Sequence, residues 1–264
     1  MVFTVKSKTV SPPPGLRTHK GANMLQVRDI SKSFGGNVVL TDLSFDINSG
    51  EVVGLIGPNG AGKTTLFNVL SGVYRSKTGH IKFNGQSFDR LKPEKICKRG
   101  LCRTFQITKP FGNISVTQNV MVGALNRTGS LKKAEQKALE ILEFVGLYDK
   151  RDTLGRSLTI ADRKRLEIAR GLATQPQLLL LDEVMAGLNP QELSEVKHLI
   201  EDIRHSGITL FIIEHIMGVM MSLSDRIIVL DYGKMLCEGS PDSISCDPDV
   251  IKAYLGEEYL AATS

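Results

Sequence analysis

The order of apolar and polar positions along the chain predicts alternating strands and helices. Short apolar runs bounded by turn residues indicate strands in the first part of the chain, at residues 25–27, 38–47, 51–56, 80–83 and 101–105. A helical pattern at residues 63–71 directly follows the third of these runs. Strands followed by helices are typical of α/β domains, so a largely parallel core sheet is expected.

The period of the pattern becomes helical between about residues 112 and 175. Residues 132–145 and 162–173 place apolar side chains three and four positions apart, which predicts two amphipathic helices. Strand runs return at residues 178–181, 209–213 and 226–230, with a helix expected at residues 191–205. We therefore expect one α/β domain over residues 24–264 with a helical insertion at about 112–175.

The first 23 residues differ in composition from the rest of the chain. Pro12, Pro13 and Pro14 follow one another, and no continuous apolar core of a secretory signal is present there. A flexible, solvated leader is expected over residues 1–23. Because the first clean strand pattern begins at Met24, we also hypothesise that translation starts at this second methionine.

Composition narrows the class of protein less than the motifs do. With 264 residues, 41% of them hydrophobic and 23% charged, the chain has the profile of a globular protein and not of a collagen or a disordered chain. A net charge of +5 fits nucleic acid, an anionic membrane surface or phosphate ligands equally well. The four cysteines form no Cys-x-x-Cys pair, so reduced thiols and no metal site are expected. No apolar stretch is long enough to predict a membrane-spanning helix.

A glycine-rich loop lies between the strand at residues 51–56 and the helix at residues 63–71. Its sequence, LIGPNGAGKTT, contains Gly57, Gly62, Lys63 and Thr64 in the spacing G-x-x-x-x-G-K-[ST]. In such a loop, backbone N–H groups surround a phosphate, the lysine spans the β- and γ-phosphates, and the hydroxyl of Thr64 binds Mg²⁺. The residues expected to bind ATP here are Gly57, Pro58, Asn59, Gly60, Ala61, Gly62, Lys63, Thr64 and Thr65.

Two later strands end in groups suited to phosphoryl chemistry. The segment LLLLDE ends in Asp182, which we expect to bind Mg²⁺, and Glu183, which we expect to polarise the attacking water as a general base. The segment LFIIEH ends in His215, which could hydrogen-bond the γ-phosphate or the water. A histidine at the end of a strand also often has a structural role, and the residues alone do not separate the two.

A basic stretch, SLTIADRKRLEIARG at residues 157–171, is expected to form one helix. It carries Arg163, Lys164, Arg165 and Arg170, which suit either a nucleic-acid surface or a phosphate ligand in another setting.

The order of these motifs resembles that of the ATP-binding subunits of ABC transporters. The chain has, in this order, the glycine-rich loop at residues 57–64 (the P-loop), RTFQ, a helical insertion, the Ser-Leu-Thr helix start, LLLLDE, AGLNP and His215. More narrowly, RKRLEIARGLATQPQLLLLDE, EGSPDSI and DPDVIKAYLGEEY resemble the LivG-type subunit of branched-chain amino acid importers. The resemblance implies an α/β fold: a P-loop NTPase (ABC ATPase) core with an antiparallel β subdomain and a helical subdomain inserted at about residues 112–175.

The resemblance also implies roles for residues outside the phosphate loop. Phe34 would stack on adenine, although a purely structural place in the core is the alternative. Gln106 would contact Mg²⁺ or the attacking water, beside the groove that receives the membrane subunit. Residues 187–189 would form the loop that crosses to a second ATP-binding subunit. The family signature Leu-Ser-Gly-Gly-Gln, which faces the γ-phosphate held by that second subunit, falls on Leu158, Thr159, Ile160, Ala161 and Asp162.

The signature departs from the family pattern. Thr159 keeps a hydroxyl, but Ile160 adds a branched side chain where a glycine lets phosphate approach closely. Asp162 adds a negative charge that suits a helix start but not a nearby triphosphate. We therefore expect this signature to bind ATP weakly, and the second subunit to be a related but different chain with a standard signature. Val184 replaces a proline, which we expect to change only loop stiffness.

Taken with the resemblance, these features predict an ATPase that uses ATP and Mg²⁺ to power import of branched-chain amino acids or a related small polar solute. Its partners would be a second ATP-binding subunit, transmembrane permease subunits and, indirectly, a substrate-binding protein, without nucleic acid. It would lie peripherally on the cytoplasmic face of the inner membrane. The alternatives are an ATP-binding subunit of a lipid or lipopolysaccharide exporter, an ABC-type ATPase that acts on DNA or the ribosome, and a nucleotide-binding module without catalysis.

Overall fold

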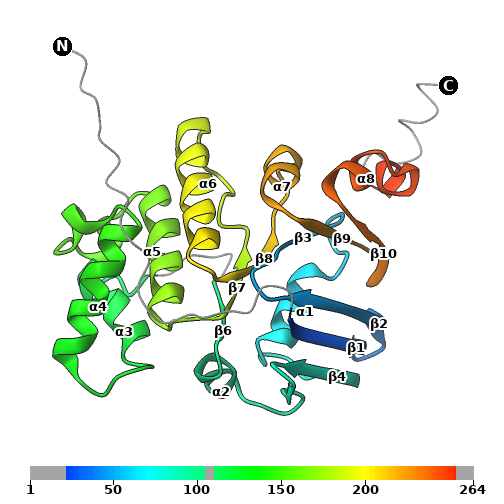
Figure 1. The fold of residues 1–264 in the computed structure, drawn as a ribbon, viewed down its shortest axis with the longest axis horizontal. Helices are drawn as coiled ribbons and strands as arrows, with labels where there is room; N and C mark the ends of the chain where they lie inside the picture. Colours follow the sequence, from blue (N-terminus) through cyan, green and yellow to red (C-terminus); the bar gives the residue numbers. More distant parts are fainter. Residues whose placement is uncertain (1–21, 105–109, 254–264) are drawn as a thin grey trace.

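The computed structural model describes residues 22–104 and 110–253, and Figure 1 shows their arrangement. Two sheets lie side by side, and they have different strand directions. The core sheet has the order β10 (Lys234–Gly239), β9 (Arg226–Asp231), β3 (Val52–Ile56), β8 (Thr209–Ile213), β7 (Leu178–Asp182) and β6 (Leu101–Arg103). Its strands are parallel except for β10, which runs antiparallel to β9.

The second sheet is antiparallel throughout. Its order is β2 (Asn37–Asn48), β1 (Asn23–Phe34), β4 (Thr78–Phe83) and β5 (Gln86–Ser87). The helices are α1 (Lys63–Leu70), α2 (Pro93–Lys98), α3 (Val116–Ala124), α4 (Leu131–Phe144), α5 (Ile160–Ala173), α6 (Pro190–His205), α7 (Met217–Leu223) and α8 (Pro241–Ser245). The predicted combination of a parallel core, an antiparallel sheet and helices within residues 112–175 is confirmed as a fold, whereas a division into domains stays a prediction.

Both faces of the core sheet are buried, which explains the uninterrupted leucines of β7. Leu179 and Leu181 pack in a cluster with α3, α4, α5 and α6, while Leu178 and Leu180 pack in a second cluster with α1 and the antiparallel sheet. Figure 1 shows α6 and α7 on one side of this sheet and α1 on the other. Parallel strands covered on both faces need apolar residues at every position, so an alternating pattern is lost. The carboxyl end of β7, where Asp182 stands, is thereby fixed from two sides.

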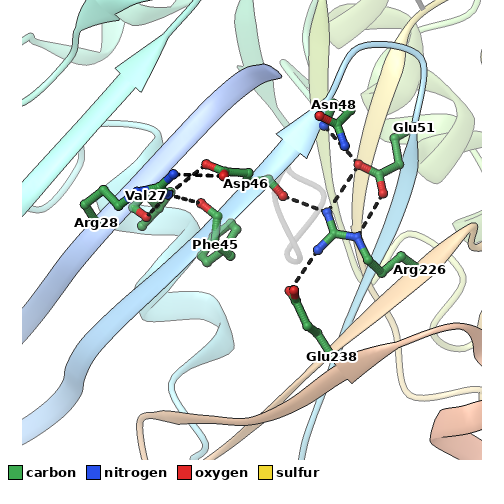
Figure 2. Close-up of polar contacts among 8 residues, drawn as sticks. All are labelled: Val27, Arg28, Phe45, Asp46, Asn48, Glu51, Arg226 and Glu238. Atoms are coloured by element: carbon green, nitrogen blue, oxygen red, sulfur yellow. Dashed lines mark hydrogen bonds and ion pairs between the residues drawn. The ribbon is translucent and has the colours of Figure 1, made fainter. Parts of the chain in front are cut away.

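A clasp of charged side chains joins the antiparallel sheet to the core sheet (Figure 2). Arg226, at the start of β9, donates to Glu51 at 2.9 Å, to the main-chain oxygen of Asp46 at 2.7 Å and to Glu238 at 2.8 Å. Asp46 also accepts a hydrogen bond of 2.8 Å from Arg28 on β1. One guanidinium therefore ties β2, the β2–β3 turn, β9 and β10 together.

The strand predictions differ from the structure mainly in length. The strand expected at residues 25–27 is β1, which continues to Phe34 through register shifts. Its interruption at Asp29, where φ is 52°, breaks the alternating pattern that sequence analysis relies on. β10 and α7 were not predicted from the pattern: β10 is a half-exposed edge strand, and α7 has only seven residues. The expected leader over residues 1–23 lies almost entirely outside the described residues.

Candidate nucleotide-binding and hydrolysis site

The glycine-rich loop connects β3 to α1, as the sequence predicts. Gly57, Gly60 and Gly62 all have positive φ, of 149°, 83° and 101°. A Cβ at Gly57 would lie 2.1 Å from the main-chain oxygen of Leu230, so a side chain cannot be accommodated there. At Gly60 nothing lies within 4 Å of such a Cβ, which leaves open space beside the loop. The glycines thus allow the backbone conformation of the loop and leave room for a ligand beside it, as a loop that surrounds a phosphate requires.

Lys63 begins α1 and folds back over the loop. Its Nζ donates to the main-chain oxygens of Gly57 at 2.6 Å and Pro58 at 2.9 Å. Burial lowers the pKa of Lys63, while Glu183 and Asp182 oppose that change. A cation held above the loop and beside the N-terminus of a helix is well placed to attract a triphosphate.

A cavity of about 340 Å³ brings the loop together with two distant residues. It is lined by Val39, Asn59, Gly60, Ala61, Gly62, Lys63, Thr64, Thr65, Glu183 and His215. The structure therefore places Glu183, from the end of β7, and His215, from the end of β8, at the same opening as Thr64. The sequence alone does not show that Glu183 and His215 lie close to Thr64, because these residues are far apart along the chain.

Glu183 and His215 form a pair at this cavity. The Nε2 of His215 lies 2.7 Å from Oε1 of Glu183, whose side chain is 12% exposed. The main chain of Glu183 has a φ of 51°, a left-handed conformation that is uncommon for a residue other than glycine. Strained backbone of this kind occurs often at functional sites because the surrounding structure must hold it in place.

Asp182 is fully buried one residue earlier. Its Oδ2 accepts a hydrogen bond of 2.7 Å from Arg103, which also donates to Asn68 on α1 at 2.7 Å. Burial raises the pKa of Asp182 despite the nearby guanidinium. The sequence analysis did not identify Arg103 as part of the site; its place three residues before Gln106 in RTFQ was the available signal.

The donor set suits Mg²⁺. Oδ1 of Asp182 is buried and has no hydrogen-bond partner among the described residues, and Thr64 lines the adjacent cavity. A buried carboxylate oxygen without a hydrogen-bond donor is costly, and a cation would satisfy it. Carboxylate and hydroxyl oxygens are ligands that Mg²⁺ prefers. Gln106, the third expected contributor, lies outside the described residues. Elsewhere, the part of the chain that the structure describes holds no cluster of metal-binding side chains, and its four cysteines are free.

The signature residues form the start of α5, away from the P-loop cavity. Thr159 is the N-cap, and its hydroxyl accepts from the main-chain N–H of Asp162 at 3.2 Å. Leu158 and Ala161 are buried, whereas Ile160 is 62% exposed. The N–H groups of the first helical turn have no intrahelical acceptor, so this end of α5 keeps the anion-attracting character that we expected. Among the described residues that line the P-loop cavity, none belongs to the signature.

The structure pairs the charge of Asp162 with neighbouring groups of the chain. Its carboxylate accepts hydrogen bonds from Lys150 at 2.5 Å and from the hydroxyl of Thr159 at 2.8 Å, and the residue is buried. Although burial alone would raise the pKa of Asp162, these two hydrogen bonds hold it below its usual value. The negative charge is compensated inside the chain, so the exposed Ile160 is the main departure left at this helix start.

Phe34 and residues 187–189, which the family resemblance assigns to ATP binding and to the partner contact, do not line the P-loop cavity. Phe34 is 43% exposed at the end of β1, so a purely structural place in the core does not describe it. Its ring stands edge-on to Tyr74 with centroids 5.1 Å apart, and the ammonium of Lys32 lies over it at 4.8 Å. In the loop at residues 187–189, Gly187 has a φ of 78° and Asn189 caps α6 through a capping box with Glu192.

Comparison with known proteins shows the family to which the chain belongs. A family model described as "ABC transporter" matches residues 40–186, which hold the P-loop, the signature and Glu183. The chain belongs to the ABC transporter family. The model described as "Branched-chain amino acid ATP-binding cassette transporter" matches residues 234–259. The predictions of an ABC ATPase fold and of an ATP-binding and ATP-hydrolysing chain are thereby confirmed.

Individual relatives cover nearly the whole chain. It is 39% identical over 250 residues to the high-affinity branched-chain amino acid transport ATP-binding protein LivG of Escherichia coli (strain K12), with 89% of this chain and 98% of LivG covered. It is 36% identical over 238 residues to the lipopolysaccharide export system ATP-binding protein LptB of Acidithiobacillus ferridurans, with 90% and 99% covered. The solved ADP conformation of MJ1267, an ATP-binding cassette of an ABC transporter, has 29% identity and a TM-score of 0.81, and covers 89% of this chain and 100% of that chain.

Proposed function

We propose that this ABC ATPase powers import of branched-chain amino acids, or of a related small polar solute, through a membrane permease. The observation that carries the ATP-driven part is the cavity in which Lys63 and Thr64 of the P-loop meet the Glu183–His215 pair. The match of residues 234–259 to the branched-chain amino acid cassette model supports the class of solute. No helix in the described ranges, 22–104 and 110–253, is long and apolar enough to cross a membrane. As a subunit that acts with a membrane permease, the chain would lie peripherally on the cytoplasmic face of the inner membrane in this proposal.

The groups of this chain divide the work of hydrolysis among them. The N–H groups of residues 57–62 and the ammonium of Lys63 bind and orient the triphosphate. Glu183 takes a proton from the attacking water, while His215 holds the Glu183 carboxylate in place at 2.7 Å. Asp182 and Thr64 would hold Mg²⁺, which when bound neutralises charge on the phosphates. Phe34 supports the adenine ring, and Gln106 has the role that the family resemblance implies, a contact to Mg²⁺ or to the attacking water.

The second half of each ATP site comes from another subunit in this proposal. The N-terminus of α5 faces the γ-phosphate held by that subunit's P-loop, through the N–H groups of Ile160 and Ala161 and the cap at Thr159. The branched side chain of Ile160 stands where ATP would approach, because it is 62% exposed at the first position of the helix. A related but different partner chain with a standard signature would then complete this chain's own P-loop site, giving one strong and one weak hydrolysis site.

A lipopolysaccharide exporter subunit is the second candidate. LptB is nearly as similar as LivG, at 36% against 39% identity, so overall identity hardly separates the two. The separate match of residues 234–259 to a branched-chain amino acid cassette model favours the importer. The genes that lie beside this one provide a direct check, since two permeases and a binding protein indicate import.

The proposal is tested by reconstituting the chain with its neighbouring permease subunits and second ATP-binding subunit in proteoliposomes. We expect ATP-dependent uptake of leucine, isoleucine or valine when the binding protein is added, and loss of that uptake with Glu183→Gln. Uptake of urea, an amide or an organic acid instead would keep the importer and change its solute. ATP hydrolysis that responds to lipopolysaccharide, without uptake of any of these solutes, would replace the proposal by the exporter.

A further inference from the structure

Lys164 is a buried cation on α5 that the site described above does not use. The residue is 7% exposed, and its Nζ donates a hydrogen bond of 2.7 Å to the main-chain oxygen of Glu183. Its helical neighbours behave differently: Arg165 pairs with Glu195 on α6, and Arg170 pairs with Glu167 on the same helix at 2.9 Å. Lys164, by contrast, contacts the main chain of the hydrolysis site at Glu183.

The surroundings of Lys164 compensate a charge that burial would otherwise make costly. Burial lowers the pKa of Lys164, and four carboxylates oppose that change: Glu214, Glu183, Asp182 and Glu167. Glu214 is 1% exposed, and its Oε1 accepts a hydrogen bond of 2.7 Å from the main-chain N–H of Met185. Lys164 and Glu214 therefore hold the backbone on either side of Val184. A buried ammonium among carboxylates is favourable only with this kind of close fit.

The backbone that they hold is strained. Glu183 has a φ of 51°, its N–H donates to the main-chain oxygen of Ile213 at 2.9 Å, and its own oxygen accepts from Lys164. Left-handed backbone at a residue other than glycine persists when its neighbours determine it from more than one side. The hydrogen bond from Lys164 supplies one of these constraints from a different element, α5.

We propose that Lys164 is a positioning residue for ATP hydrolysis: it fixes the main chain of Glu183 to α5, the helix whose N-terminus faces the second subunit. The inference rests on the proposed role of Glu183 as general base. Because one ammonium joins the start of α5 to the Glu183 backbone, a movement of α5 toward the partner's ATP also moves this chain's own carboxylate. Lys164 thereby links the two ATP sites through a single chain.

The test uses the full chain in its reconstituted transporter complex. Lys164→Met removes the hydrogen bond to Glu183, and we expect kcat to fall by roughly 10- to 100-fold with an unchanged KM, since small displacements of a catalytic group have effects of this size. Lys164→Arg keeps a buried donor and is expected to recover most of the lost kcat. Arg165→Met, on the same helix and paired with Glu195, is the matched control and should hydrolyse ATP at the wild-type rate.

A second variant keeps the test decisive if Lys164→Met fails to fold. Lys164→Met with Glu214→Gln removes the cation together with one carboxylate, so the buried charge is balanced while the contact to Glu183 is still missing. A stable double variant with low kcat and normal ATP binding supports positioning. Wild-type kcat in the double variant overturns it and leaves charge balance as the role of Lys164. If Glu183→Gln itself hydrolyses ATP normally, the proposed role of Glu183 fails, and this inference fails with it.

Discussion

The P-loop site and the start of α5 differ in which part of each residue the proposed chemistry needs. At the P-loop site, backbone N–H groups help to bind the triphosphate but hydrolysis needs side chains, and Lys63, Asp182, Glu183 and His215 all keep the expected groups. At the start of α5, the proposed contacts to the partner's ATP come from backbone N–H groups, although four of the five signature residues, Thr159, Ile160, Ala161 and Asp162, differ from Leu-Ser-Gly-Gly-Gln. The helix nevertheless begins at Ile160 with Thr159 as its cap.

This difference shows where substitution is tolerated. A backbone donor survives a change of side chain if the helix still starts at the same residue, and the Lys150–Asp162 pair secures that start here. A carboxylate that accepts a proton has no such substitute. The proposed complex therefore needs this chain more for its P-loop site than for its signature, and each prediction below changes one of the two regions.

The largest effect is expected from Glu183→Gln at the P-loop site. Loss of the general base should lower ATP hydrolysis by roughly 10²- to 10⁴-fold, while ATP binding to Lys63 and the loop is retained. Phosphate release and nucleotide binding, measured in parallel, separate these effects. Glu140→Gln, an exposed carboxylate on α4, is the control. Hydrolysis by Glu183→Gln at the wild-type rate would show that the P-loop site does not depend on the Glu183 carboxylate, and the proposed difference between this site and the start of α5 would be wrong.

The next largest effect is expected on the free energy of unfolding, from a change at the buried Glu214 close to the same site. Burial raises the pKa of Glu214 to about 7, with Glu183 also raising it and Lys164 opposing the rise. An acid whose pKa is higher in the folded than in the unfolded protein loses stability as pH rises from the unfolded value of about 4.3 to the folded one. Glu214→Gln should therefore be more stable than the wild type at pH 8, by up to about 3 kcal/mol, and similar to it near pH 4. Urea unfolding at pH 4 and pH 8 measures the difference in unfolding free energy between the variant and the wild type. An equal difference at the two pH values would exclude the titration of Glu214 as its cause.

Much of the P-loop region could be predicted from sequence because each of its motifs is local. LIGPNGAGKTT contains its own strand end, loop and helix start, and the uninterrupted leucines before Asp182 indicate a strand covered on both faces. The role of Phe34 came from the family resemblance alone and stays a prediction, since the structure shows only that the residue is 43% exposed.

The partners of these residues could not be predicted, since they depend on contacts between distant segments. Arg103 meets Asp182 across 79 positions, and Lys164 reaches the Glu183 backbone across 19. Asp162 is a further example: the helix start and its negative charge were predicted, but the compensating Lys150 lies in a short 3-10 turn with no periodic pattern. A local sequence pattern reveals which groups are present and leaves open which charges neutralise one another.

At the start of α5, Lys150→Met should cost roughly 1–2 kcal/mol of unfolding free energy, less than for a fully buried pair because Lys150 is 48% exposed. The pair holds the pKa of Asp162 below its usual value, so its contribution is present above about pH 4 and disappears as the carboxylate is protonated at lower pH. The difference between variant and wild type should thus shrink in acid, as measured by urea unfolding between pH 3 and 7. Lys133→Met on α4 serves as the control, and a constant difference across this range would separate the effect from the Asp162 charge.

The smallest effect is expected from Ile160→Gly, which changes clearance at the signature and leaves the P-loop site intact. If the branched side chain lengthens one hydrogen bond to the partner's ATP, removing it should recover about 1 kcal/mol, or about a fivefold rise in hydrolysis at the partner's P-loop. Single-turnover hydrolysis in the mixed complex, with the partner's P-loop as the one competent site, measures this rise. Ile160→Ala separates clearance from backbone freedom, because alanine removes the branch without the flexibility of glycine. An unchanged rate of hydrolysis in both variants would mean that the side chain of Ile160 does not limit how closely the partner's ATP approaches the start of α5.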